Sequence, residues 1–175
     1  LLAFVTKSGE TDVLHLYDLK TGNMPDPLRF ADLVVLGSPS WSPDGNRIAL
    51  SAVDKAGMSD LYVFDLTSKS LTRLTNDFYE DRDPAWSPDG STIIFSSDRT
   101  TFGKEGYLNL FSYNMASTEI EYITIGRANF LAPSWSRDGK YLTFTSDIDG
   151  AQNVWALDMT QPRLTRPMIK LTQFT

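Results

Sequence analysis

The sequence predicts an all-β fold of the β-propeller class, and two observations carry this prediction. The first is a motif of seven residues, Pro-x-Trp-Ser-x-Asp-Gly, which occurs three times with its tryptophan at Trp41, Trp86 and Trp135. The tryptophans are 45 and 49 residues apart, and periods of this size are typical of propellers or helical solenoids. The second observation selects the propeller, because the segments after each motif alternate apolar and polar residues with the period of a strand.

Each repeat contains four predicted strands, which we name A to D. Strand A carries the tryptophan, strands B and C follow as alternating runs, and strand D is a weaker run that ends in Leu-Thr or Ile-Thr. Four-stranded units of this length cannot bury both faces alone, so we expect them to stack radially around an axis. In chain order, the predicted B and C strands are residues 47–50 and 61–65, 92–95 and 110–114, and 141–144 and 154–158.

The connection between strands A and B has the chemistry of a tight turn in every copy. Proline presets φ, aspartate hydrogen-bonds the local backbone, and glycine accepts a positive φ. The third copy has Arg137 in place of the proline, and we expect its turn to persist with less rigidity. We interpret the three tryptophans and the Asp-Gly pairs as structural repeat positions; these pairs are Asp44 and Gly45, Asp89 and Gly90, and Asp138 and Gly139.

The repeat resembles that of the TolB-like β-propeller family. The resemblance rests on Pro-x-Trp-Ser-Pro-Asp-Gly followed by Ile-Ala-Leu-Ser, then Leu-Tyr-Val-Phe-Asp-Leu, then Arg-Leu-Thr. Three full copies and a partial N-terminal copy cover nearly the whole chain. Because TolB-like propellers have six blades, the resemblance implies that this chain is a fragment of a larger protein.

The repeat also predicts where the blades divide within one propeller domain. We expect about four blades, of which the first is incomplete because Phe4 falls in the column of the last apolar residue of strand B. The predicted units are residues 1–38, a partial blade with strands B to D and a linker, then 39–77, 78–126 and 127–175 as blades two to four.

Composition excludes several classes of function. The chain has 175 residues, a net charge of -6 and no cysteine, which excludes disulfides, thiolate metal sites and cysteine nucleophiles. The acidic balance argues against nucleic acid as a partner, and no apolar run approaches the ~20 residues of a membrane span, so we expect no membrane insertion.

No catalytic constellation is recognisable. The single histidine, His15, falls in register with the aromatic residues of strand C, namely Tyr62, Phe111 and Trp155, which favours a core or interface role. No nucleophile elbow is present, and a lone histidine without cysteine cannot make the usual zinc site. We therefore predict no catalytic residue, no cofactor and no metal.

Propeller geometry directs attention to one loop face. The A–B and C–D turns lie on one face, and the B–C and D–A connections lie on the other, where the loops are longer and more varied. We predict that this second face binds a protein; the alternative is a solvated face of charged loops. The candidate residues are Asp77, Tyr79, Glu80, Asp81 and Asp83 of one D–A connection, and Asp98, Arg99, Phe102, Lys104, Glu105 and Tyr107 of the longest B–C loop.

Three functional hypotheses follow. The first is a non-catalytic propeller that acts as a protein-binding scaffold, with a periplasmic or extracellular location implied by the resemblance and the cytoplasm left open. The second is an accessory gating propeller of a tricorn-like or prolyl-oligopeptidase-like serine peptidase whose catalytic domain lies outside this chain. The third, a channel enzyme such as a polysaccharide lyase, is disfavoured by the single histidine. Exposed blade faces also favour self-association.

Overall fold

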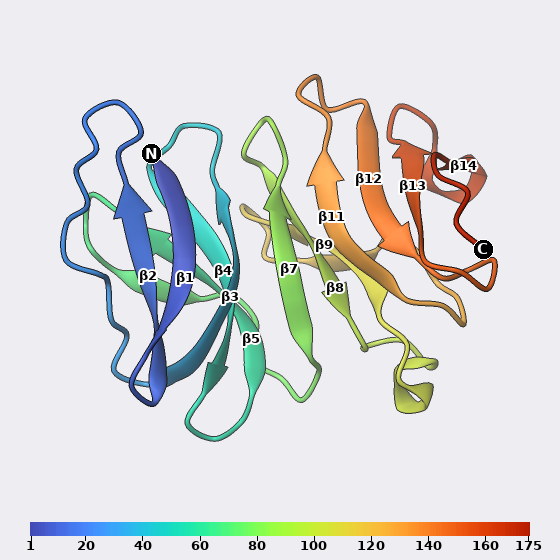
Figure 1. Ribbon diagram of the computed structural model, residues 1–175. Coiled ribbons are helices and arrows are strands. Elements are labelled where there is room, and N and C mark those ends of the chain that lie inside the picture. The colour runs from blue at the N-terminus through green and yellow to red at the C-terminus, as the bar shows by residue number, and fades with distance from the viewer.

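The computed structural model describes residues 1–175. Its fold consists of four antiparallel sheets. One sheet has two strands and three have four strands, and they follow one another from the N-terminus to the C-terminus (Figure 1). This confirms the predicted propeller of four-stranded antiparallel blades with an incomplete first blade. Neither of the two helices, each of three residues, has the length or hydropathy of a membrane span.

The strands within each large sheet pair in chain order, as in a propeller blade. The first sheet consists of β1 (Leu2–Ser8) and β2 (Thr11–Tyr17). The second consists of β3 (Leu33–Trp41), β4 (Arg47–Asp54), β5 (Ser59–Asp65) and β6 (Leu71–Arg73). The third consists of β7 (Asp81–Trp86), β8 (Thr92–Ser97), β9 (Asn109–Asn114) and β10 (Ile120–Tyr122). The fourth consists of β11 (Phe130–Trp135), β12 (Tyr141–Ser146), β13 (Asn153–Asp158) and β14 (Met168–Lys170).

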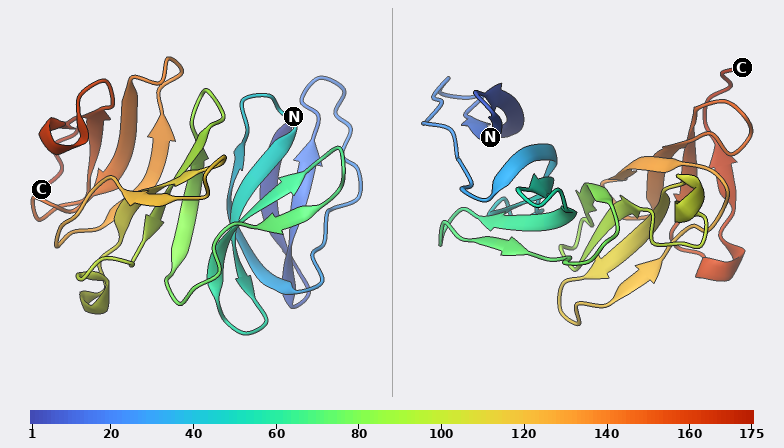
Figure 2. Two further views of the ribbon diagram at one scale, coloured as in Figure 1. Left: turned by 180° about the vertical axis from the view of Figure 1, so that it is seen from behind. Right: turned by 90° about the horizontal axis from the view of Figure 1, so that it is seen from below.

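The first strands of the three large sheets lie side by side at the inner edge of the stack. Strand β7 contacts both β3 and β11, whereas β6, β10 and β14 are the outer strands of their sheets. The two termini lie at opposite ends of the row of sheets (Figure 2). The strands named A in the sequence are therefore the inner strands of their sheets.

Two strands differ from the predicted pattern. β3 begins at Leu33, ahead of residue 39, because Leu33 and Leu36 are buried and extend the pairing with β4. The fourth-strand position of the first blade holds only an isolated bridge between Leu14 and Leu28. Pro25 and Pro27 precede Leu28, and neither can donate a backbone hydrogen bond to a longer ladder.

The core consists of apolar layers between neighbouring sheets. Trp86 is buried and packs with Ala49 and Val63, which belong to the preceding sheet. Trp135 packs in the same way against a cluster that includes Ile94 and Leu110 of the third sheet. Each tryptophan thus lies between two blades, where its large apolar area joins them.

The three A–B turns share one hydrogen-bond pattern. In the second turn the Ser87 hydroxyl donates to Asp89 Oδ1 at 2.6 Å and accepts from the Thr92 N–H at 3.0 Å, and Gly90 has φ of 71°. The serine hydroxyl is the main reason that the pKa of the Asp89 carboxyl lies below its ordinary value. The turn that contains Arg137 keeps the same hydrogen bonds and a glycine φ of 72°, because the serine, aspartate and glycine determine its geometry.

Candidate functional site

The predicted loop face forms one end of the stack of sheets, at the lower edge of Figure 1. The connection between β6 and β7 and the loop between β8 and β9 meet there. The Glu80 N–H donates to Asp98 Oδ1 at 2.9 Å, and Phe78 and Tyr79 share a hollow with residues 98–101 and 103–104. Two segments that are separate in the sequence therefore form one surface. We call residues 77–80, which project from it, the ridge.

Arg99 lies beneath the ridge and holds it. Its guanidinium pairs with Asp81 at 2.5 and 2.7 Å and with Asp77 at 3.3 Å. Its Nε donates to the Ser97 hydroxyl at 3.0 Å, and its guanidinium carbon lies 5.2 Å from the centre of the Tyr79 ring. Because the Arg99 side chain is only 11 % exposed, these charge-assisted hydrogen bonds are shielded from water.

Asp81 corrects one expectation from the sequence. It was expected on the binding surface, but it is completely buried at the start of β7. Burial raises the pKa of its carboxyl, and the nearby charge of Arg99 opposes that rise. Asp81 is therefore a structural anchor for the ridge and offers no surface to a partner.

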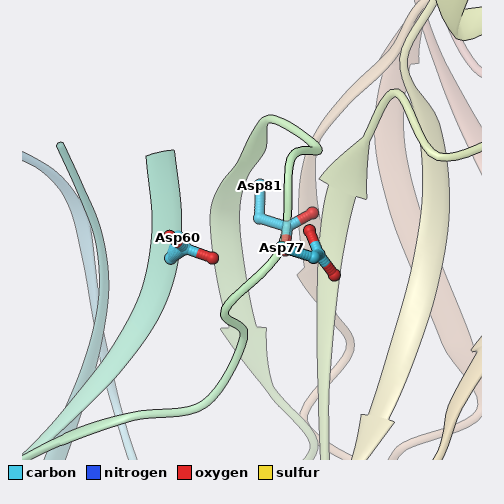
Figure 3. A group of neighbouring side chains, drawn as sticks. All are labelled: Asp60, Asp77 and Asp81. Atoms are coloured by element: carbon cyan, nitrogen blue, oxygen red, sulfur yellow. The ribbon is translucent and has the colours of Figure 1, made fainter. Parts of the chain in front are cut away.

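Three carboxylates gather where the second and third sheets meet. Asp60, Asp77 and Asp81 each offer an oxygen within 4.8 Å of the others, and Figure 3 shows Asp60 on β5 beside the segment that carries the other two. Two arginines offset part of this charge, since Arg73 pairs with Asp60 and Arg99 pairs with Asp77 and Asp81. Each arginine pairs on its own side of this junction, and a hydrogen bond from the Ser59 hydroxyl of β5 to the Asp81 carbonyl oxygen, at 3.2 Å, joins the two sheets.

The loop between β8 and β9 is held by contacts within itself and by contacts with Arg127 of the next connection. The helix η1 (Gly103–Glu105) folds the chain back so tightly that a Cβ at Gly103 would lie 1.6 Å from the Asp98 carbonyl oxygen. Glu105 pairs with Arg127 at 3.3 Å, and Arg127 stacks on Phe102 with 5.6 Å from guanidinium carbon to ring centre. Lys104 is exposed, and Tyr107 is half-buried where the loop rejoins the sheet.

Asp83 lies apart from the ridge although it is close in sequence. It occupies a bulge of β7, where its φ is 55°. Its carboxylate accepts from the Ser38 hydroxyl at 2.6 Å and from the Ala132 N–H at 3.3 Å, so it connects three blades. These residues line a pocket of about 480 Å³ along the inner strands.

The most exposed aromatic residue of the face was not among the predicted site residues. Phe78 is 94 % exposed at the tip of the ridge. A signal was present in the sequence, because a large apolar residue stands there within an acidic connection. The ion-pair partners Asp60 and Arg73 were also missed, and they occupy ordinary strand positions that do not distinguish a buried pair from an exposed one.

Comparisons with known proteins agree with this architecture. The family profile of the TolB beta propeller domain matches residues 1–104, more than half of the chain. The chain belongs to this family. The Tol-Pal system protein TolB of Ruthia magnifica subsp. Calyptogena magnifica is 44% identical over 43 residues, which are 25% of this chain and 10% of that protein.

Solved structures extend the likeness over nearly all of this chain. The crystal structure of TolB from Acinetobacter baumannii has a TM-score of 0.79 and 27% identity, and it covers 97% of this chain. This TolB-like chain spans 40% of that protein's length. The crystal structure of the tricorn protease has a TM-score of 0.64 and 16% identity, and the match covers 98% of this chain and 19% of the protease chain. At this level of identity the match shows only that the two share a fold.

Proposed function

We propose that this TolB-like propeller is a non-catalytic protein-binding scaffold that binds through the face formed by its B–C and D–A loops. The observation that carries the proposal is the ridge, where an exposed aromatic residue stands on a base fixed by buried ion pairs. Ordered loops on a rigid scaffold are the usual place for binding residues. The membership of the TolB family supports the same role.

Photo-crosslinking with a matched pair of positions tests this proposal. A photoreactive amino acid replaces Lys104, which is exposed on the loop face, or Leu164, which is 88 % exposed in the connection between β13 and β14. That connection lies on the opposite face, with the A–B turns. After irradiation in an extract of the source cells, we expect specific protein adducts from position 104 and none from position 164. Adducts from position 164 alone would refute the choice of face.

The gating propeller of a serine peptidase is the alternative, and the shared fold with the tricorn protease does not favour it over a scaffold. A serine-directed fluorophosphonate probe distinguishes the two, because it labels the natural full-length protein only if a hydrolase domain is attached.

A periplasmic or extracellular location is part of the scaffold proposal, because the chain belongs to the TolB family. Self-association through exposed blade faces stays a prediction.

A further inference from the structure

Phe78 is the most exposed large apolar side chain of the protein, and its own fold makes almost no use of it. At 94 % exposure its ring stays in contact with water, so it adds little to the hydrophobic stabilisation of the chain. Exposed aromatic residues on rigid supports are frequent anchors of protein interfaces. The position of Phe78 therefore indicates a role in binding.

The ridge that carries Phe78 is fixed on both sides of it. The Asp77 carboxylate accepts the Tyr79 N–H at 3.1 Å, and the Asp98 carboxylate accepts the Glu80 N–H at 2.9 Å. Arg99 pairs with Asp77 and lies under the Tyr79 ring. Because the loop is already ordered, a partner that contacts Phe78 loses little conformational entropy of the loop.

Two hollows flank the ridge and differ in chemistry. The first, of about 300 Å³, is lined by Val53 and Met58, and Glu80 is its only charged residue. The second, of about 370 Å³, is lined by polar groups that include Asp98 and Lys104. The first hollow thus combines an apolar wall with a single negative charge.

A lysine or arginine side chain matches the first hollow. Its methylene groups can lie along Val53 and Met58 while its charged end reaches Glu80, and a cation beside the open face of Phe78 is attracted to the ring. Glu80 pairs with Arg82 at 3.1 Å, but both side chains are well exposed, so this pair is weak and a partner's cation can replace Arg82.

We propose that the ridge binds an extended segment of a partner protein in which a lysine or arginine stands next to an apolar residue. The basic side chain occupies the hollow between Met58 and Phe78, and the apolar neighbour packs on the Phe78 ring. This inference rests on the proposed protein-binding function and adds the anchor residue and the chemistry of the partner.

Peptide selection followed by affinity measurement tests the inference. Short random peptides displayed on phage are selected against the full chain, and the selected peptides are titrated by fluorescence polarisation. The variants are Phe78→Ala, Glu80→Gln and Leu164→Ala, the last replacing an apolar residue of similar exposure on the opposite face. All three side chains are exposed, and circular dichroism melting checks that each variant keeps its fold.

We expect the selected peptides to contain a basic residue beside an apolar one. Phe78→Ala raises their Kd about tenfold or more, as for an interface anchor. Glu80→Gln raises it less and reduces its dependence on salt, and Leu164→Ala leaves it unchanged.

Two results would overturn the inference, and only the second would also overturn the proposed protein-binding function. If the peptides lack the basic–apolar pair, or bind Phe78→Ala as tightly as the unchanged chain, the ridge is not the anchor but the protein-binding function stands. If no peptide is enriched over a surface without the protein, both the inference and the proposed function fail.

Discussion

The substitution Arg99→Met tests whether a buried ion pair supports the ridge. Methionine keeps an unbranched side chain but removes the guanidinium, which makes two hydrogen bonds to Asp81 and one to Asp77. Asp81 has no exposed surface, so water cannot replace these partners. The substitution therefore leaves a buried carboxylate without its cation.

Removal of one partner from a buried ion pair typically destabilises a protein by about 3–5 kcal/mol. We expect a value in this range for Arg99→Met, because the Asp81 side chain is completely buried and that of Arg99 is only 11 % exposed. Adding Asp81→Asn should recover part of the loss, since the amide carries no charge that needs a counterion. The double variant is then more stable than Arg99→Met alone.

The dependence on pH gives an independent check. Burial already raises the pKa of Asp81, and loss of Arg99 removes the charge that opposes this rise, so the pKa increases further. A carboxyl with a raised pKa in the folded state favours folding below its unfolded pKa and loses that contribution as the pH rises through the folded pKa. The stability gap between Arg99→Met and the unchanged chain therefore narrows as the pH falls from neutral toward the unfolded pKa of about 3.9.

Urea denaturation followed by tryptophan fluorescence measures these differences, with the free energy of unfolding obtained by linear extrapolation. A loss below about 1 kcal/mol for Arg99→Met, the range of exposed ion pairs, would refute the buried pair as the support of the ridge. A gap that stays constant with pH would refute the assignment of the loss to Asp81.

Three further predictions concern the blades. Trp86→Ala should lower the free energy of unfolding by about 3–5 kcal/mol in chemical denaturation, because a large buried side chain between two sheets is lost; a loss below about 1 kcal/mol would contradict its inter-blade position. Gly90→Ala should lower the melting temperature more than Gly45→Ala, because both glycines have a positive φ but only at Gly90 would a Cβ lie 3.3 Å from Pro43; equal shifts would contradict this contact. The pKa of the Asp89 carboxyl is lowered in the folded protein. Its contribution to stability is therefore present above the unfolded pKa of about 3.9 and is lost as the pH falls through the folded value. In acid titrations followed by circular dichroism, the difference in stability between Asp89→Ala and the unchanged chain should be smaller at low pH than at neutral pH.

The sequence was most informative where a feature repeats. The period of the tryptophan motif and the alternation after it predicted the strand pairing of the three large sheets, because each blade depends on contacts within about 45 residues of chain. The first blade was less predictable, since Pro25 and Pro27 reduce its expected strand D, the fourth strand of a complete blade, to one bridge. The early start of β3 was missed because the motif marks only the end of that strand.

The site was only partly predictable for a related reason. The loop face followed from the order of strands, and the two connections that the sequence singled out meet there, while their role in binding stays a prediction. Within them, the alternation of charged residues does not reveal which carboxylate is buried. Asp81 and Glu80 are neighbours, yet one is enclosed by Arg99 and the other faces solvent.

By itself, the sequence determined the blade, because turn chemistry and period-two patterning act over short distances along the chain. Only the tertiary structure decided which side chains of the loop face pair, which are buried and which are presented to solvent. Asp60 lies on β5 and Asp81 on β7, and their carboxylates come close together only when the two sheets are stacked. Phe78 stays exposed because Arg99 supports the ridge from beneath, while no other part of the chain covers the Phe78 ring.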